Sequence, residues 1–88
     1  MAWECVFQGH VQGVGFRYRA VSIARRHAVL GFVRNLPSGD VQLVVDGESQ
    51  AIEALLTELQ HTMLGHIDHV TRREVQLHEP LGSFEIRR

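Results

Sequence analysis

Apolar residues recur with two different spacings along this chain, and the change between them marks its predicted elements. Near the N-terminus, apolar and aromatic residues occupy every second position from Trp3 to Phe7, which predicts a strand that ends at Gly9. From Phe16 the spacing becomes helical, and the pattern predicts a helix that ends around residues 29–31. The apolar stripe of this helix consists of Phe16, Ala20, Ile23, Ala24 and Ala28.

The middle of the chain predicts two strands joined by a turn. Residues 30–36 are mostly apolar and form the second predicted strand. Residues 37–40 are Pro-Ser-Gly-Asp, which are all favoured in turns, so a hairpin is expected. The third strand begins at Val41, places apolar residues at alternate positions, and stops at residues 46–47.

A second helix is predicted after the hairpin, because apolar residues recur there at spacings of three and four. Ser49 stands just before this stripe, where a hydroxyl oxygen can cap the helix. Gly65 is expected to end it. The stripe consists of Ile52, Leu55, Leu56, Leu59 and Met63.

The C-terminal part of the chain predicts one longer strand and one short strand. Residues 67–77 are rich in Val, Ile and Thr and form the fourth predicted strand. Charged residues at 72–74 interrupt its alternation, which is typical of a strand at a sheet edge. Phe84 and Ile86 indicate a short fifth strand.

The predicted order of elements is β-α-β-β-α-β with a short extra strand at the C-terminal end. The rules for connections resolve this order into one antiparallel sheet, with strand order 4-1-3-2 and two helices on one face. This arrangement is the ferredoxin-like sandwich of the α+β class. The 88 residues suit a single domain that covers residues 1–88.

Composition narrows the classes of partner. A net charge of −1, with acidic and basic residues interspersed, argues against a protein that mainly binds nucleic acid or an anionic membrane. Cys5 is the only cysteine, so no internal disulfide can form and a cytoplasmic location is expected. The chain has neither a signal-peptide pattern nor an apolar run of about 18 residues, so no membrane association is expected.

The predicted loop between the first strand and the first helix carries the candidate chemistry. Gly9, Gly13 and Gly15 lie in this loop, and Arg17 follows at the start of the helix. Glycine lets a backbone turn consecutive N–H groups toward one anion, and a helix start adds further N–H groups and a positive dipole end. The planar guanidinium of arginine matches two phosphate oxygens. The loop is therefore a candidate phosphate-binding site.

Two familiar phosphate-binding loops are excluded. The loop of nucleoside triphosphatases ends in Gly-Lys-Ser/Thr, whereas Phe16 and Arg17 follow Gly15 here. The dinucleotide-binding loop needs a third glycine where Tyr18 stands. The chain is also too short for the paired βαβ units of that fold.

Two motifs give this chain its resemblance to a known family. The first covers residues 9–17 with the pattern Gly-x-Val-Gln-Gly-Val-x-Phe-Arg. The second is Gly-Phe-Val-Arg-Asn at residues 31–35, followed by Gly39, Val41 and Gly47. With the order of the elements, the motifs cover nearly the whole chain, and at this separation they resemble the two signatures of the acylphosphatase family.

The resemblance implies hydrolysis of the carboxyl–phosphate bond of acyl phosphates without a metal or another cofactor. It implies that Arg17 binds the phosphoryl group and that Asn35 orients the attacking water. A small-molecule substrate, inorganic phosphate or sulfate as a product-like ligand, and a monomeric state are expected. The implied phosphate-binding residues are His10, Val11, Gln12, Gly13, Val14, Gly15, Phe16 and Arg17.

Two positions depart from the family pattern. His10 stands where arginine or lysine is more frequent, and Phe7 stands where a branched aliphatic residue is usual. Because a histidine of ordinary pKa is mostly neutral at neutral pH, we expect weaker substrate binding than in a typical member. Neither position alters the pair Arg17 and Asn35.

Alternative functions stay open at this stage. A domain with this fold could hold a phosphorylated ligand without turnover. A sheet with one open face could also bind RNA, although the third predicted strand lacks the aromatic residues that stack on bases. The side chain of Gln12 could either brace the loop or contact the phosphate.

The remaining candidate side chains favour structural roles. Of the six histidines, only His66 and His69 lie close together, and no third ligand follows at a recognised spacing, so a metal is not expected. Cys5 lies in an alternating apolar strand and is expected to be an inert core thiol. Trp3 and Tyr18 are expected to pack against neighbouring side chains.

Overall fold

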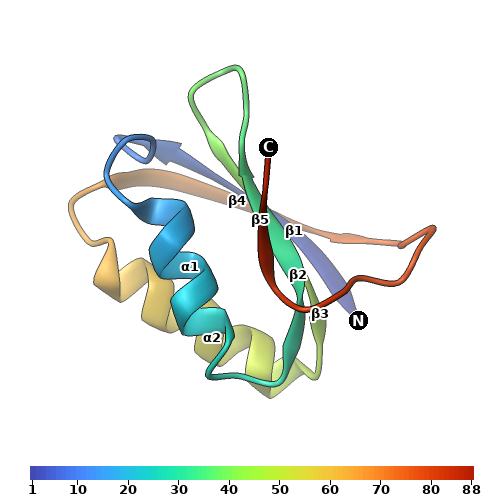
Figure 1. Ribbon diagram of the computed structural model, residues 1–88. Helices are drawn as coiled ribbons and strands as arrows, with labels where there is room; N and C mark the ends of the chain where they lie inside the picture. The colour runs from blue at the N-terminus through green and yellow to red at the C-terminus, as the bar shows by residue number, and fades with distance from the viewer.

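The computed structural model describes residues 1–88, and its elements follow the predicted order (Figure 1). A small mixed sheet lies against two helices, and the chain begins in an interior strand of the sheet and ends in an edge strand. The elements are β1 (Ala2–Gly9), α1 (Phe16–Ala24), β2 (Val29–Asn35), β3 (Val41–Gly47), α2 (Ser49–Thr62), β4 (Ile67–Val75) and β5 (Glu85–Arg87).

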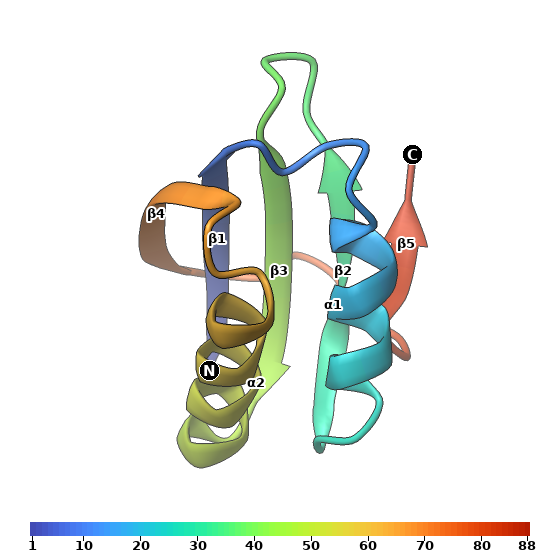
Figure 2. The same cartoon turned by 90° about the vertical axis from the view of Figure 1, so that its left-hand side faces the viewer.

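The strand order in the sheet is β4-β1-β3-β2-β5, which confirms the predicted order 4-1-3-2 with an extra strand. The first four strands are antiparallel to their neighbours, but β5 pairs in parallel with β2, so the prediction of a purely antiparallel sheet is wrong at this edge. The connection from β4 to β5 passes behind the sheet, on the side away from the helices (Figure 2). This connection brings β5 to the sheet edge opposite β4, where β5 runs parallel to β2.

Both helices cover the same face of the sheet, as predicted (Figure 2). The predicted stripe of α2 is buried in full, and the first four members of the predicted α1 stripe are buried as well. They meet the alternate residues Cys5 and Phe7 of β1 in one hydrophobic core. Burial of these apolar faces is the main source of stability for elements that are short on their own. Neither helix has the length and apolar composition that a membrane-spanning helix needs.

The first helix ends at Ala24, several residues before the predicted end, and Ala28 is exposed. Val29 explains the difference, because its side chain is buried and it pairs with Gly47 as the first residue of β2. The chain must therefore turn back before residue 29. It does so through tight turns in which His27 N–H donates to the carbonyl oxygen of Ala24 at 3.0 Å.

The start of the second helix also differs from the prediction. Glu48 occupies the N-cap position, Ser49 is already helical, and no side chain caps the helix. At the other end the helix finishes at Thr62, and Gly65 follows in a left-handed conformation. The helix depends on its buried stripe more than on its caps.

Phe84 closes the core beside β2. Its side chain is only 2% exposed, although it precedes the short strand in which it was predicted to lie. The space for its ring exists because position 31 of β2 is glycine. A Cβ at Gly31 would lie 2.7 Å from the Phe84 ring and 2.1 Å from the carbonyl oxygen of Val44.

Candidate active site

The sheet register brings the two motif segments to the same end of the molecule. Val41 of β3 pairs with Phe7 on one side and with Asn35 on the other. The ends of β1 and β2 therefore lie level with each other, separated by one strand. The loop that follows β1, the start of α1 and the β2–β3 turn meet at the top of Figure 2.

The loop from β1 to α1 depends on glycine at two positions. Gly13 has φ 77° and Gly15 has φ 79°, in the left-handed region that other residues enter at a cost. A Cβ at either position would meet no atom within 4 Å, so the requirement comes from the backbone conformation and not from lack of space. Val11 and Phe16 fix the ends of this turn in the core, where the Phe16 ring lies 5.0 Å from that of Phe7.

This loop leaves a series of backbone donors without protein partners. The N–H groups of residues 10–15 donate none of the backbone hydrogen bonds outside the helices and strands. The first three N–H groups of α1 have no partner within the helix either, because the first helical bond runs from Arg19 to the carbonyl of Gly15 at 3.0 Å. Unpaired donors at a helix N-terminus form a favourable environment for an anion.

Arg17 and Asn35 line one cavity of about 220 Å³, together with Gly13 and Gly15 of the loop. Arg17 comes from the first turn of α1, is half-buried, and takes part in none of the ion pairs. Asn35 is the last residue of β2, and its Oδ1 is buried without a hydrogen-bond partner. The cavity, which we call the catalytic cavity, thus combines a free cation with an unpaired amide oxygen.

Gln12 joins the two segments that form the catalytic cavity. Its Nε2 donates to the carbonyl oxygens of Leu36 and Asp40, both at 2.9 Å. These carbonyls belong to the turn that directly follows Asn35. Of the two roles left open for this side chain, the structure therefore shows the bracing one.

The other predicted phosphate-binding residues contribute differently. Val11, Gly13, Gly15, Phe16 and Arg17 border the catalytic cavity, whereas His10, Gln12 and Val14 do not. The side chain of His10 is exposed and lies edge-on to His66, with ring centroids 5.9 Å apart. Val14 packs against the core. These three residues therefore lie outside the lining of the cavity.

Two residues at the rim of the cavity were not among the predicted site residues. Tyr18 is 79% exposed, so the prediction that it packs against its neighbours is wrong. Its place off the apolar stripe of α1 was the available signal. Ile86 reaches the rim from β5, and no local pattern indicates that this strand joins the sheet beside β2.

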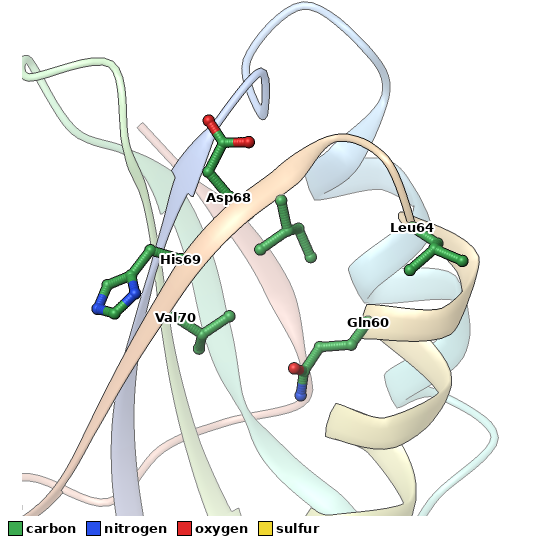
Figure 3. Close-up of a pocket in the computed structure, with 6 residues that line it drawn as sticks. Gln60, Leu64, Asp68, His69 and Val70 are labelled. Carbon is green, nitrogen blue, oxygen red and sulfur yellow. The ribbon is translucent and has the colours of Figure 1, made fainter.

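A different hollow, of about 390 Å³, lies between the end of α2 and the start of β4 (Figure 3). Gln60 and Leu64 border it on one side, and Asp68, His69 and Val70 on the other. It contains no arginine or lysine and carries a carboxylate, so it offers a phosphate group little attraction. The catalytic cavity is the better anion site.

Cys5 and the histidines provide no competing reactive centre. Burial raises the pKa of the Cys5 thiol to about 11, which keeps it protonated at neutral pH and poorly nucleophilic. No group of three His, Cys, Asp or Glu side chains is placed to hold a metal ion.

Comparisons with known proteins agree with this geometry. The sequence profile of the family described as acylphosphatase matches residues 3–86. An acylphosphatase of Nitratidesulfovibrio vulgaris is 43% identical over 82 residues, which cover 90% of this chain and 82% of the relative. The crystal structure of a Bacillus subtilis acylphosphatase, at 24% identity, shares the fold with a TM-score of 0.89. The match covers 99% of this chain and 98% of the Bacillus subtilis chain.

A solved acylphosphatase structure from Coxiella burnetii is 31% identical and has a TM-score of 0.85. The match covers 98% of this chain and 90% of the Coxiella burnetii chain. Together with the profile match, these likenesses extend over nearly all of the sequence and include both segments that form the catalytic cavity. The chain therefore belongs to the acylphosphatase family, and its activity is that of an acylphosphatase, a hydrolase.

Proposed function

We propose that the catalytic cavity is the active site and that Arg17 and Asn35 carry the hydrolysis of an acyl phosphate there. One observation supports this most strongly. Arg17, whose guanidinium has no carboxylate partner, and Asn35, whose Oδ1 is buried without a donor, border the same 220 Å³ space, next to unpaired backbone N–H groups. A buried amide oxygen without a partner is costly, and unpaired N–H groups beside a free cation favour an anion.

The loop and Arg17 bind the phosphoryl group. The N–H groups of residues 10–17 donate to its oxygens, and the guanidinium forms charge-assisted hydrogen bonds with two of them. Because these donors are fixed before substrate arrives, they stabilise the charge that develops on the phosphoryl oxygens in the transition state. The family resemblance assigns the same role to these positions.

Asn35 orients the attacking water through its side-chain amide. The water oxygen bonds to phosphorus, the bond from phosphorus to the acyl oxygen breaks, and the carboxylate leaves with the electron pair. One water proton passes to a phosphate oxygen or to solvent. An amide is a weak base, but a loose phosphoryl transition state requires little deprotonation of the nucleophile.

The leaving group explains why the site can work without a strong general acid. A carboxylate has a conjugate acid of pKa about 4, so it departs without protonation. The alkoxide from a phosphate monoester is far more basic and would need a strong general acid, whereas no carboxylic acid or histidine borders this cavity. We therefore propose acyl phosphates, and not phosphate monoesters, as the substrates.

Two further parts of the proposal concern the molecule as a whole. Residues 1–88 form one domain with a single core and act as a cytoplasmic monomer, with inorganic phosphate or sulfate as a product-like ligand and neither nucleic acid nor membrane as a partner. The single cysteine, the near-neutral charge and the arginines on edge strand β4 support this. Light scattering after gel filtration checks the monomer.

The test of function is the release of benzoate from benzoyl phosphate, in the presence of a chelator and with a phosphate monoester as the comparison substrate. Turnover of benzoyl phosphate alone, inhibited competitively by inorganic phosphate, is the expected result. A folded protein that binds phosphate but hydrolyses neither compound would instead be the non-catalytic binding module.

A further inference from the structure

We infer that the acyl group of the substrate binds in a groove between α1 and β5, and that this groove favours large apolar acyl groups. The groove encloses about 500 Å³ and is bordered by Tyr18, Val21, Ser22, Arg25, Glu85 and Ile86. We call it the acyl groove. The inference rests on the proposed function, because it extends the catalytic cavity that binds the phosphoryl group.

The groove lies directly beside the catalytic cavity. Tyr18 and Ile86 border both spaces, so the two meet along a shared wall. The fold creates this junction by placing β5 at the sheet edge next to α1 (Figure 2). Strand β5, whose place in the sheet no sequence pattern indicated, therefore completes the surface beside the catalytic cavity.

The shape of the catalytic cavity directs the acyl group toward the groove. Val11 and Phe16 border the cavity and are buried in the core, so no group can extend past them. The cavity volume of about 220 Å³ is less than half that of the groove. When the phosphoryl group of a substrate is bound by the loop and Arg17, its acyl group therefore has room in the groove, beyond the side chains of Tyr18 and Ile86.

The shared wall is apolar and unusually exposed. Tyr18 is 79% exposed and Ile86 is 38% exposed, and only three other large hydrophobic residues of the chain are exposed. Exposed apolar side chains that come together from separate elements are typical of a binding surface. A planar ring can pack against the Tyr18 ring and the Ile86 side chain, whereas an acetyl group is too small to reach both.

The charged groups of the groove disfavour a cationic acyl group and leave apolar contact to distinguish uncharged ones. Arg25 and Glu85 border it with opposite signs. Glu85 already accepts a hydrogen bond from Arg87 Nε at 3.3 Å, whereas Arg25 takes part in no ion pair. The unpaired Arg25 disfavours a cationic acyl group, and apolar contact with Tyr18 and Ile86 determines the preference among uncharged acyl groups.

The experiment compares kcat/KM for benzoyl phosphate and acetyl phosphate in the wild type and in the variants Tyr18→Ala, Tyr18→Phe and Ile86→Ala. We expect the ratio of benzoyl to acetyl phosphate to fall about tenfold in Tyr18→Ala and about threefold in Ile86→Ala, as apolar contact area is lost. Tyr18→Phe keeps the ring and should keep the ratio. Leu64 is an exposed leucine beside the hollow of Figure 3, so Leu64→Ala is the matched control. It should leave kcat/KM unchanged for both substrates.

The outcomes separate the inference from the proposed function. Turnover of both substrates with an unchanged ratio in Tyr18→Ala and Ile86→Ala would overturn the acyl groove and leave the proposed function standing. A loss of self-association in those variants with an unchanged ratio would identify the groove as a contact between two copies, which also overturns it. If the folded wild type hydrolyses neither substrate, the proposed function fails and the groove assignment fails with it.

Discussion

Gln12 shows how a single side chain connects the two halves of the site. It lies in the loop that supplies the backbone donors, and it holds the turn that follows Asn35. The motif marked this residue as important, but its role could not be decided from sequence, because its partners are backbone carbonyls 24 and 28 positions away. The meeting of Arg17 and Asn35 at one cavity was easier to predict, since each lies at an element boundary within a recognisable motif.

Replacing Gln12 with alanine should weaken both stability and catalysis. The variant removes two hydrogen bonds from the carbonyls of Leu36 and Asp40, which keep only their backbone donors within the turn, and this should lower the free energy of unfolding by about 1–2 kcal/mol. It should also reduce kcat, because Asn35 is then held less firmly. Urea unfolding and steady-state kinetics check this, with Gln60→Ala as the control, whose Nε2 bonds only the Leu56 carbonyl of its own helix. A kcat equal to that of the wild type would contradict the positioning role.

Strands and helices were predictable where their residues face one core. The α2 stripe and the alternation in β1 and β3 gave the correct faces, because burial of those side chains determines the structure. The end of α1 was not predictable in the same way, since helical spacing continues to Ala28 while the pairing of Val29 with Gly47 ends the helix earlier. The parallel pairing of β5 depends on a connection that has no periodic pattern.

Gly31 is predicted to be essential for the packing of β2. In Gly31→Ala the new Cβ would lie 2.1 Å from the Val44 carbonyl oxygen, so the strand and the Phe84 ring must move. We expect a loss of about 2–3 kcal/mol in the free energy of unfolding. Chemical denaturation measures it against Gly82→Ala, where a Cβ meets nothing within 4 Å and a change within about 0.5 kcal/mol is expected. Equal stability of the two variants would show that the Gly31 contact is easily relieved.

A hydrogen-bonded chain of polar side chains crosses four strands of the sheet. Arg34 Nε donates to Gln42 Oε1 at 2.6 Å, and Gln42 Nε2 donates to Glu4 Oε2 at 2.6 Å. Arg73 Nε donates to Glu4 Oε1 at 2.8 Å. The hydrogen bond from Arg73 is the main cause that lowers the pKa of Glu4, with further lowering by Gln42 and by the charge of Arg34, against the opposing effect of burial.

This lowered pKa predicts part of the acid sensitivity of the fold. Because the folded state holds Glu4 ionised below its ordinary pKa of 4.5, its contribution is fully present above that value and is lost as the pH falls through the lower folded pKa. Glu4→Gln should therefore lose less stability than the wild type as the pH is lowered from about 5 to about 3. Denaturant unfolding at several pH values measures how the free energy of unfolding of each protein depends on pH. An equal pH dependence in the wild type and in Glu4→Gln would rule out this role for Glu4.

At the scale of the whole molecule, the order of the strands creates the site. Since β1 and β2 run in the same direction on either side of β3, their ends bring the donor loop and Asn35 together at one edge, and β5 adds Ile86 beside them. The motifs predicted which residues meet there, and the topology explains why they can. The acyl groove was outside the reach of sequence patterns, because its two sides come from elements more than 50 positions apart.

The central claim is that Arg17 and Asn35 act together on the phosphoryl group. The most direct measurement is kcat/KM for benzoyl phosphate in Arg17→Ala, Asn35→Ala and Arg19→Ala, with folding checked by circular dichroism. Arg19 is the matched control, since it lies on the same helix, is exposed and does not border the catalytic cavity. We predict losses of about a hundredfold or more for Arg17→Ala and Asn35→Ala and a change below about twofold for Arg19→Ala. Near wild-type turnover in folded Arg17→Ala or Asn35→Ala would contradict the account.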